Sequence, residues 1–250
     1  MESITTELLF FLMAVAAVAG LVDAIAGGGG LLTLPALLWA GLPPVQALAT
    51  NKLQGSLGAF SASIHFIIRG DILRNNLWPL VGAAFLGSAG GALMVQYLPN
   101  ELLRQIIPIL LLLFSLYFLF SPRISDEDAT QRLPLGWFAL ALCFPIGFYD
   151  GFFGPGTGSF FVLAVVVLLG YNLTRATGIT KILNLTSNLA ALLFFALGGH
   201  VLWELGLLLG LAQAGGAWLG AHLAVRHGAA IIRPLLVIIS LAVSLKLLLT

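Results

Sequence analysis

Long apolar segments separated by short polar stretches fill almost the whole chain of 250 residues. A membrane-spanning helix needs about 20 apolar residues, whereas strands of outer-membrane barrels alternate apolar and polar positions over about ten residues. The run from Ile106 to Phe120 shows no such alternation. The pattern therefore predicts an all-α, polytopic helical membrane protein. Its apolar segments lie at 7–25, 30–41, 45–69, 77–97, 102–121, 135–152, 158–170, 173–198, 203–223 and 230–249.

The second half of the chain is similar to the first. A shift of 127 residues (150 − 23) places Asp150 on Asp23. A shift of 129 residues (181 − 52) places Lys181 on Lys52. Such agreement at nearly one period indicates two copies of one unit, as in many secondary transporters. We predict a first membrane repeat at residues 1–121, a polar linker at 122–134 and a second membrane repeat at 135–250.

Glycine-rich stretches interrupt the apolar pattern at matching places, residues 27–30 and 154–158. Glycine favours irregular backbone and Pro155 lacks an amide donor, so we expect a broken helix pair in each half. Unpaired backbone groups at the breaks must be buried in protein or face a water-filled cavity. The helices expected to follow, from Leu31 and Ser159, would present N-termini that attract anions. A tight turn in a helical hairpin is the alternative.

The basic residues indicate how the halves are oriented. If each broken pair crosses twice, or dips in and returns, each half has an odd number of crossings and the halves are inverted. Seven arginines then share one face against two basic residues on the other, as the positive-inside rule requires. We therefore predict inverted repeats in the cell (inner) membrane, with the linker 122–134 cytoplasmic and both termini outside. The seven are Arg69, Arg74, Arg123, Arg132, Arg175, Arg226 and Arg233, and the two are Arg104 and Lys246.

Composition excludes several classes of protein. The chain is 60% hydrophobic and 8% charged, with a net charge of +1, whereas an ordinary soluble domain is about 25% charged. A water-soluble globule is excluded, and no nucleic-acid partner is expected. The single cysteine, Cys143, excludes an intramolecular disulfide. The N-terminal apolar stretch has no basic n-region and no convincing cleavage site, so we expect it to be a mature membrane segment.

Two lysines at matching positions lie inside apolar segments, where a charge is costly unless it is paired or faces water. Lys52 lies about 10 Å into its segment at the usual helical rise, and Lys181 occupies the matching position. Polar side chains and glycines around them suggest a binding site for a small anion. Snorkelling toward an interface or a purely structural ion pair is the alternative. The candidate substrate-binding residues are Gly28, Gly29, Asn51, Lys52, Gln54, Gly156, Thr157, Thr180, Lys181, Asn184 and Asn188.

Two carboxylates, Asp23 and Asp150, lie beside the glycine breaks. Each could pair with a lysine, cap a helix or carry a coupling proton, and we rank pairing or capping above proton carriage. The coupling ion could be H⁺ or Na⁺. The histidines form no His-x-x-x-His pair and no Cys/His cluster, so neither a metal site nor a cofactor is expected.

Other motifs have structural interpretations. Gly87-x-x-x-Gly91 and Gly216-x-x-x-Gly220 permit close helix approach, either within the chain or at a homodimer interface. No Gly-x-Ser-x-Gly elbow or His-Glu-x-x-His motif occurs, so the chain is not expected to be an enzyme.

These motifs together resemble the sulfite exporter TauE/SafE family of small bacterial and archaeal membrane transporters. The resemblance covers nearly the whole chain. It implies transport of small anionic sulfur compounds, such as sulfite or organosulfonates, by export driven by an ion gradient. The motifs that carry it are Gly20–Gly30, which ends in four glycines, Leu32-Thr33-Leu34-Pro35, Ala49-Thr50-Asn51-Lys52 and the stretch from Gly147 to Gly158.

The functional hypothesis is a secondary transporter that exports a small sulfur-containing anion by alternating access. Lys52 and Lys181, with neighbouring amides and hydroxyls, would hold the anion near the membrane midplane while the two repeats rock about it. Its partners would then be the anion, a coupling ion and membrane lipid. An anion channel is the first alternative, and a non-transporting membrane assembly subunit is the second.

Overall fold

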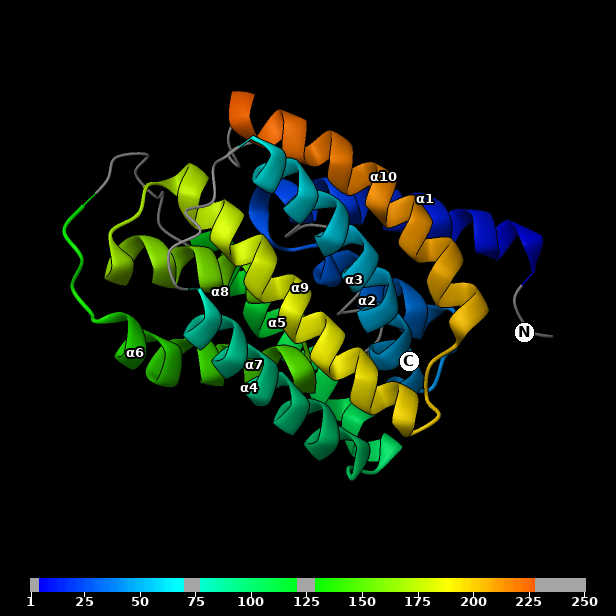
Figure 1. Cartoon of the computed structure of the whole chain (residues 1–250). Helices are drawn as coiled ribbons and strands as arrows, with labels where there is room; N and C mark the ends of the chain where they lie inside the picture. The colour runs from blue at the N-terminus through cyan, green and yellow to red at the C-terminus, as the bar shows by residue number, and fades with distance from the viewer. Residues whose placement is uncertain (1–4, 70–76, 121–128, 228–250) are drawn as a thin grey trace.

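A computed structural model describes residues 5–69, 77–120 and 129–227, and these residues form a bundle of helices without strands (Figure 1). Among the described residues, four helical segments are long and apolar enough to cross a membrane: Thr6–Ala26, Trp78–Gln96, Leu135–Phe152 and Leu173–Leu197. The predicted all-α, multi-pass class is therefore confirmed, while the predicted segment 230–249 lies outside the described residues. The helices are α1 Thr6–Ala26, α2 Gly30–Trp39, α3 Pro44–Ile68, α4 Trp78–Gln96, α5 Asn100–Phe120, α6 Leu135–Phe138, η1 Ala139–Cys143, α7 Phe144–Phe152, α8 Thr157–Ala164, η2 Val165–Leu169, α9 Leu173–Leu197 and α10 Trp203–His227.

The first glycine-rich stretch breaks the helix as predicted. α1 ends at Ala26, and Gly27 follows with a φ of 76°, a left-handed conformation that glycine adopts without strain. The amide of Gly27 donates to the carbonyl of Asp23, which closes the last turn of α1. α2 then begins at Gly30, one residue before the predicted Leu31.

The second glycine-rich stretch breaks the helix in a similar way. α7 ends at Phe152, and Gly154 and Gly156 have φ angles of 100° and 89°. α8 begins at Thr157, two residues before the predicted Ser159. The α6, η1 and α7 segments form one continuous helix in which η1 is a π-helical turn.

The two helices that carry the lysines, α3 and α9, run in opposite directions, as the colour gradient in Figure 1 shows. α10 lies parallel to α3: methyl groups added to Gly206 and Gly210 would meet Leu53 and Leu57, so the contacts advance together along both helices. The C-terminal ends of α3 and α10 and the N-terminal end of α9 lie together, at the upper left of Figure 1. The inverted repeat itself stays a prediction, because the counterpart of α5 lies outside the described residues.

Both Gly-x-x-x-Gly motifs form close contacts within the chain. A methyl group on Gly87 or Gly91 of α4 would overlap carbonyl oxygens of α7, and one on Gly216 or Gly220 of α10 would overlap carbonyl oxygens of α1. Small residues let helix backbones approach closely where apolar lipid supplies no hydrophobic driving force. Each contact joins a helix of one predicted repeat to a helix of the other, so the two halves are interleaved.

The segment between the two halves is partly fixed to the second one. The amide of Ala129 donates to the carbonyl of Gly170 at 2.8 Å, and the amides of Arg132 and Leu133 donate to the carbonyl of Leu168 at 2.9 and 3.1 Å. These bonds satisfy carbonyl groups at the end of η2 that have no partner within the helix. The C-terminal part of the polar linker therefore packs on the second half.

Enlarging Gly216 is expected to destabilise the protein, because its Cβ position is filled by the backbone of α1. Gly216→Leu should lower the free energy of unfolding by about 1–3 kcal/mol, as overpacking does elsewhere. Gly215→Leu is the matched control, since a Cβ at the neighbouring Gly215 meets nothing within 4 Å. Thermal unfolding in detergent measures both variants, and equal melting temperatures would contradict the α1–α10 contact.

Candidate functional site

Two ion pairs with buried lysines lie at the centre of the described bundle. Lys52 Nζ on α3 lies 3.0 Å from Asp150 Oδ1 on α7, and Lys181 Nζ on α9 lies 3.1 Å from Asp23 Oδ2 on α1. Each pair joins a lysine of one half to an aspartate of the other half. Both lysine side chains are 1% exposed, so neither snorkels to the surface of the chain.

The Asp23–Lys181 pair is held by several further bonds. Asp23 Oδ1 accepts the amide of Gly29 at 3.3 Å, so both carboxylate oxygens have donors. The ammonium of Lys181 also donates to the main-chain carbonyl of Asp23. Lys181 therefore contacts both the side chain and the backbone at the end of α1, and the pair fixes the first helix break.

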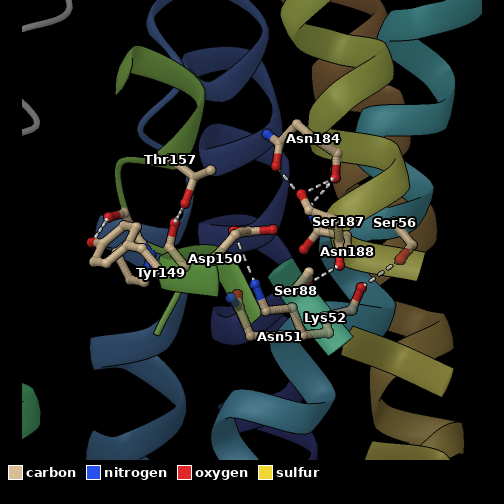
Figure 2. Close-up of polar contacts among 12 residues, drawn as sticks. Asn51, Lys52, Ser56, Ser88, Tyr149, Asp150, Thr157, Asn184, Ser187 and Asn188 are labelled. Atoms are coloured by element: carbon tan, nitrogen blue, oxygen red, sulfur yellow. Dashed lines mark hydrogen bonds and ion pairs between the residues drawn. The ribbon is translucent and has the colours of Figure 1, made fainter. Parts of the chain in front are cut away.

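The Lys52–Asp150 pair is less constrained (Figure 2). Asp150 Oδ1 accepts from Lys52, whereas the buried Oδ2 has no hydrogen-bond partner among the described residues. Gly154 lies close to the lysine, because a methyl group there would lie 2.7 Å from Lys52 Nζ. Glycine at this position, with its positive φ, is therefore needed for the ammonium to reach Asp150.

The two helix breaks contact each other. A methyl group on Gly27 would lie 2.6 Å from the carbonyl carbon of Gly158, and one on Gly30 would lie 3.1 Å from Cα of Pro155. The hydroxyl of Ser159 donates to the carbonyl of Ala26 across the two halves. The irregular backbone of both breaks is thus buried in protein, as a membrane interior requires.

A cavity of about 30 Å³ lies between the breaks, α3, α9 and α10. A cavity needs about 10–15 Å³ to hold one water, so this cavity has room for about two waters. Among the predicted site residues, Asn51, Lys52, Gly156, Asn184 and Asn188 line it, as do both aspartates. The other lining residues are Gly27, Gly30, Gly55, Gly154, Gly158 and Gln213.

Several predicted binding residues lie away from this cavity. Lys181 forms an ion pair with Asp23, and the amide N–H of Gly29 donates to the same aspartate. Gln54 and Thr180 are fully buried outside the cavity lining, and their side-chain polar atoms have no partner among the described residues. Gly28 and Thr157 are also absent from the lining, and the hydroxyl of Thr157 donates to the carbonyl of Gly154 at 2.6 Å.

Sequence reasoning missed Gln213 of α10, whose side chain lines the cavity and is 5% exposed. Its Oε1 has no partner among the described residues, although Gly58 of α3 packs directly against the amide. A single glutamine inside the apolar run 205–221 was the signal that could have identified it, because polar side chains inside a membrane segment are expensive.

Two asparagines are oriented by their neighbours. The hydroxyl of Thr33 donates to Asn51 Oδ1 at 2.5 Å, and Asn188 Nδ2 donates to Asn184 Oδ1 at 2.8 Å. Because these bonds occupy the carbonyl oxygens, the amide nitrogens of Asn51 and Asn184 are the atoms available to a ligand. With the ammonium of Lys52, they give the cavity three donors suited to the oxygens of an anion.

Comparison with known proteins gives consistent matches over nearly the whole chain. Residues 12–247 match the family model described as sulfite exporter TauE/SafE. The chain is 48% identical to the Escherichia coli "Probable membrane transporter protein YfcA" over 241 residues, 96% of this chain and 90% of that protein. It is 46% identical to a Haemophilus influenzae "Probable membrane transporter protein" over 241 residues, 96% of this chain and 94% of that protein. No solved structure matches the chain at a significant level.

Removing Lys181 alone is expected to destabilise the protein, because Asp23 would keep a partly buried charge without its cation. Lys181→Met should lower the free energy of unfolding by about 3 kcal/mol, the usual cost of breaking a buried pair. The double variant Lys181→Met with Asp23→Asn removes both charges and should recover part of this loss. A double-mutant cycle on unfolding free energies measures the coupling, and purely additive effects would contradict the ion pair.

Proposed function

The chain belongs to the sulfite exporter TauE/SafE family, and from this membership we propose that it exports a small sulfur-containing anion of the sulfite or organosulfonate class. The family and the names of the relatives indicate a membrane transporter and not an enzyme. The family description supports the choice of substrate class.

The observation that carries the proposal is the buried Lys52 beside a cavity whose available donors are amides. A sulfonate or sulfite presents three oxygens, which can accept from an ammonium and from two amide nitrogens at once. Bonds from a charged donor to an anion are about twice as strong as those between neutral groups. Because Lys52 is already paired with Asp150, an anion must compete with this carboxylate for the ammonium.

We propose alternating access as the mechanism. The cavity of about 30 Å³ is bordered by the two contacting helix breaks and has room for about two waters. An anion of four or more heavy atoms needs a wider site, so binding has to move the two interleaved halves relative to each other. Rocking of one repeat against the other would open the site to each side in turn.

The proposed location is the inner membrane, with the linker 122–134 in the cytoplasm and both termini outside. Support comes from the arginines, because Arg69 follows α3 and Arg175 lies in the first turn of α9, at one end of the bundle. Arg104 lies in the first turns of α5, which begins just after α4 ends, at the opposite end. This asymmetry follows the positive-inside rule.

Anion binding is expected to stabilise the purified protein and to depend on Lys52. Sulfite, methanesulfonate and sulfoacetate should raise the melting temperature, while chloride at equal ionic strength should not. Lys52→Ala should lose this shift, because it removes the ammonium at the cavity, whereas Arg104→Ala, at an exposed position on α5, should keep it. An undiminished rise in melting temperature in Lys52→Ala would contradict the assignment of Lys52 to the binding site.

Transport is expected to be that of a carrier. Liposomes preloaded with an unlabelled substrate anion should transiently accumulate the labelled anion against its gradient, since a carrier exchanges one for the other across the membrane. Flux should also saturate with concentration. Linear flux without counterflow would indicate an anion channel, and the absence of any protein-dependent flux would favour an assembly subunit.

A further inference from the structure

We propose that Asp150, and not its counterpart Asp23, takes up a proton when the transported anion binds to Lys52. The proposal rests on the proposed function, because it concerns what happens at the same site when an anion enters. Under this proposal the two ion pairs behave differently during transport. The Lys52–Asp150 pair breaks when the anion binds, while the Lys181–Asp23 pair stays intact.

The first observation is the difference between the two carboxylates. Both oxygens of Asp23 have donors, and the partner lysine also holds the backbone carbonyl of Asp23. Asp150 has one partnered oxygen, and its second oxygen is buried without a partner among the described residues. Releasing Lys52 breaks one contact of Asp150, whereas releasing Lys181 would also disturb the end of α1.

The second observation is access to the cavity. Both Lys52 and Asp150 line it, whereas Lys181 does not. An anion that enters the cavity therefore meets the ammonium of Lys52 while Asp150 is still bound to it. The ammonium of Lys181 donates two bonds to Asp23 and does not line the cavity.

The charge balance then requires a proton. Before binding, the site holds one ammonium and one carboxylate. After the anion takes the place of Asp150 on Lys52, the side chain of Asp150, only 2% exposed, would keep an unpaired negative charge beside a second anion. A buried carboxylate without a cation is costly, and a second anion beside it adds repulsion, so neutralising the carboxylate removes both costs. A proton from water binds to a carboxylate oxygen of Asp150, and one anion and one proton occupy the site together without net charge.

The titratable groups near Asp150 are few. Lys52 faces it from α3, Tyr149 is its neighbour on α7, and Asp23 lines the same cavity from α1. The hydroxyl of Tyr149 donates to the carbonyl of Pro155, so it is already engaged. α4 and α8 contain no titratable side chain among their residues, and Lys181 of α9 is bound to Asp23. Asp150 is therefore the carboxylate that loses its cation when the anion arrives.

Sodium fits the site less well than a proton. In transporters coupled to Na⁺, carbonyl oxygens freed by broken helices coordinate the ion. Here side-chain hydroxyls occupy such carbonyls at both breaks: Ser159 donates to Ala26, Thr157 to Gly154 and Tyr149 to Pro155. A proton needs only the one carboxylate oxygen that Asp150 leaves without a donor. A carrier of this kind exports whenever the product of anion and proton activities is higher inside.

The decisive experiment counts the protons taken up on anion binding. The full-length protein in detergent is titrated calorimetrically with methanesulfonate, whose charge is constant between pH 5 and 8, in buffers of different ionisation enthalpy. We expect uptake of about one proton per anion and a Kd that falls about tenfold for each unit decrease in pH, by linkage. Binding without proton uptake and with a pH-independent Kd would overturn the inference while leaving the proposed function intact.

Variants at the two aspartates separate their roles. Asp150→Asn should bind methanesulfonate without proton uptake, whereas Asp23→Asn should keep the proton uptake of the unmodified protein in whatever fraction folds. Infrared difference spectra give a second readout: methanesulfonate should produce a carboxylic acid C=O band that Asp150→Asn lacks and Asp23→Asn retains. Persistence of the band in Asp150→Asn would assign the proton elsewhere. No binding of methanesulfonate, sulfite or sulfoacetate by the unmodified protein would overturn the proposed function itself.

Discussion

A charge inside an apolar bundle must be paired, and this constraint determines much of the architecture. Lys52 and Lys181 are both buried, so each requires a carboxylate at its own depth. Both aspartates stand on the last turns before a helix break, where the backbone can turn away and leave the side chain facing inward. Because each lysine binds the aspartate of the other half, neither half can satisfy its own charge. The two ion pairs therefore make the halves interdependent.

The close helix contacts between the halves accompany these two ion pairs. α1, whose Asp23 pairs with Lys181, lies against α10 of the second half, and α7, whose Asp150 pairs with Lys52, lies against α4 of the first half. Backbones that approach so closely leave no room for side chains between them. The glycines at positions 87, 91, 216 and 220 meet this condition in both contacts. The helices that carry the paired aspartates, α1 and α7, are thus the same helices that pack against the glycine motifs.

The sequence predicted the class of protein, the ends of most helices and both breaks, because apolar length and glycine clusters act locally along the chain. It also identified Lys52 and the two aspartates, since charges in apolar segments are conspicuous. It did not predict which lysine pairs with which aspartate, because periodicity assigns residues to a helix face without saying which helix lies opposite. Gln213 was missed although it is a lone polar side chain in an apolar run, because the run alone does not say that this side chain faces the cavity.

The similarity between the halves does not extend to the surroundings of the two lysines. Lys52 and Lys181 occupy matching positions, and a symmetric pair of anion ligands was the simplest interpretation. The environments differ, however: Asn184 and Asn188 stand near the cavity on α9, while the matching positions on α3 are Gly55 and Ala59. The small Gly55 admits Asn188, whose Oδ1 lies 3.1 Å from where a methyl group on Gly55 would be. A duplicated scaffold thus holds an asymmetric cavity, in which one half supplies the ammonium and the other supplies most of the amides. Because the carboxylate paired with that ammonium comes from the second half as well, a ligand that binds Lys52 in the proposed way would act directly on the contact between the halves.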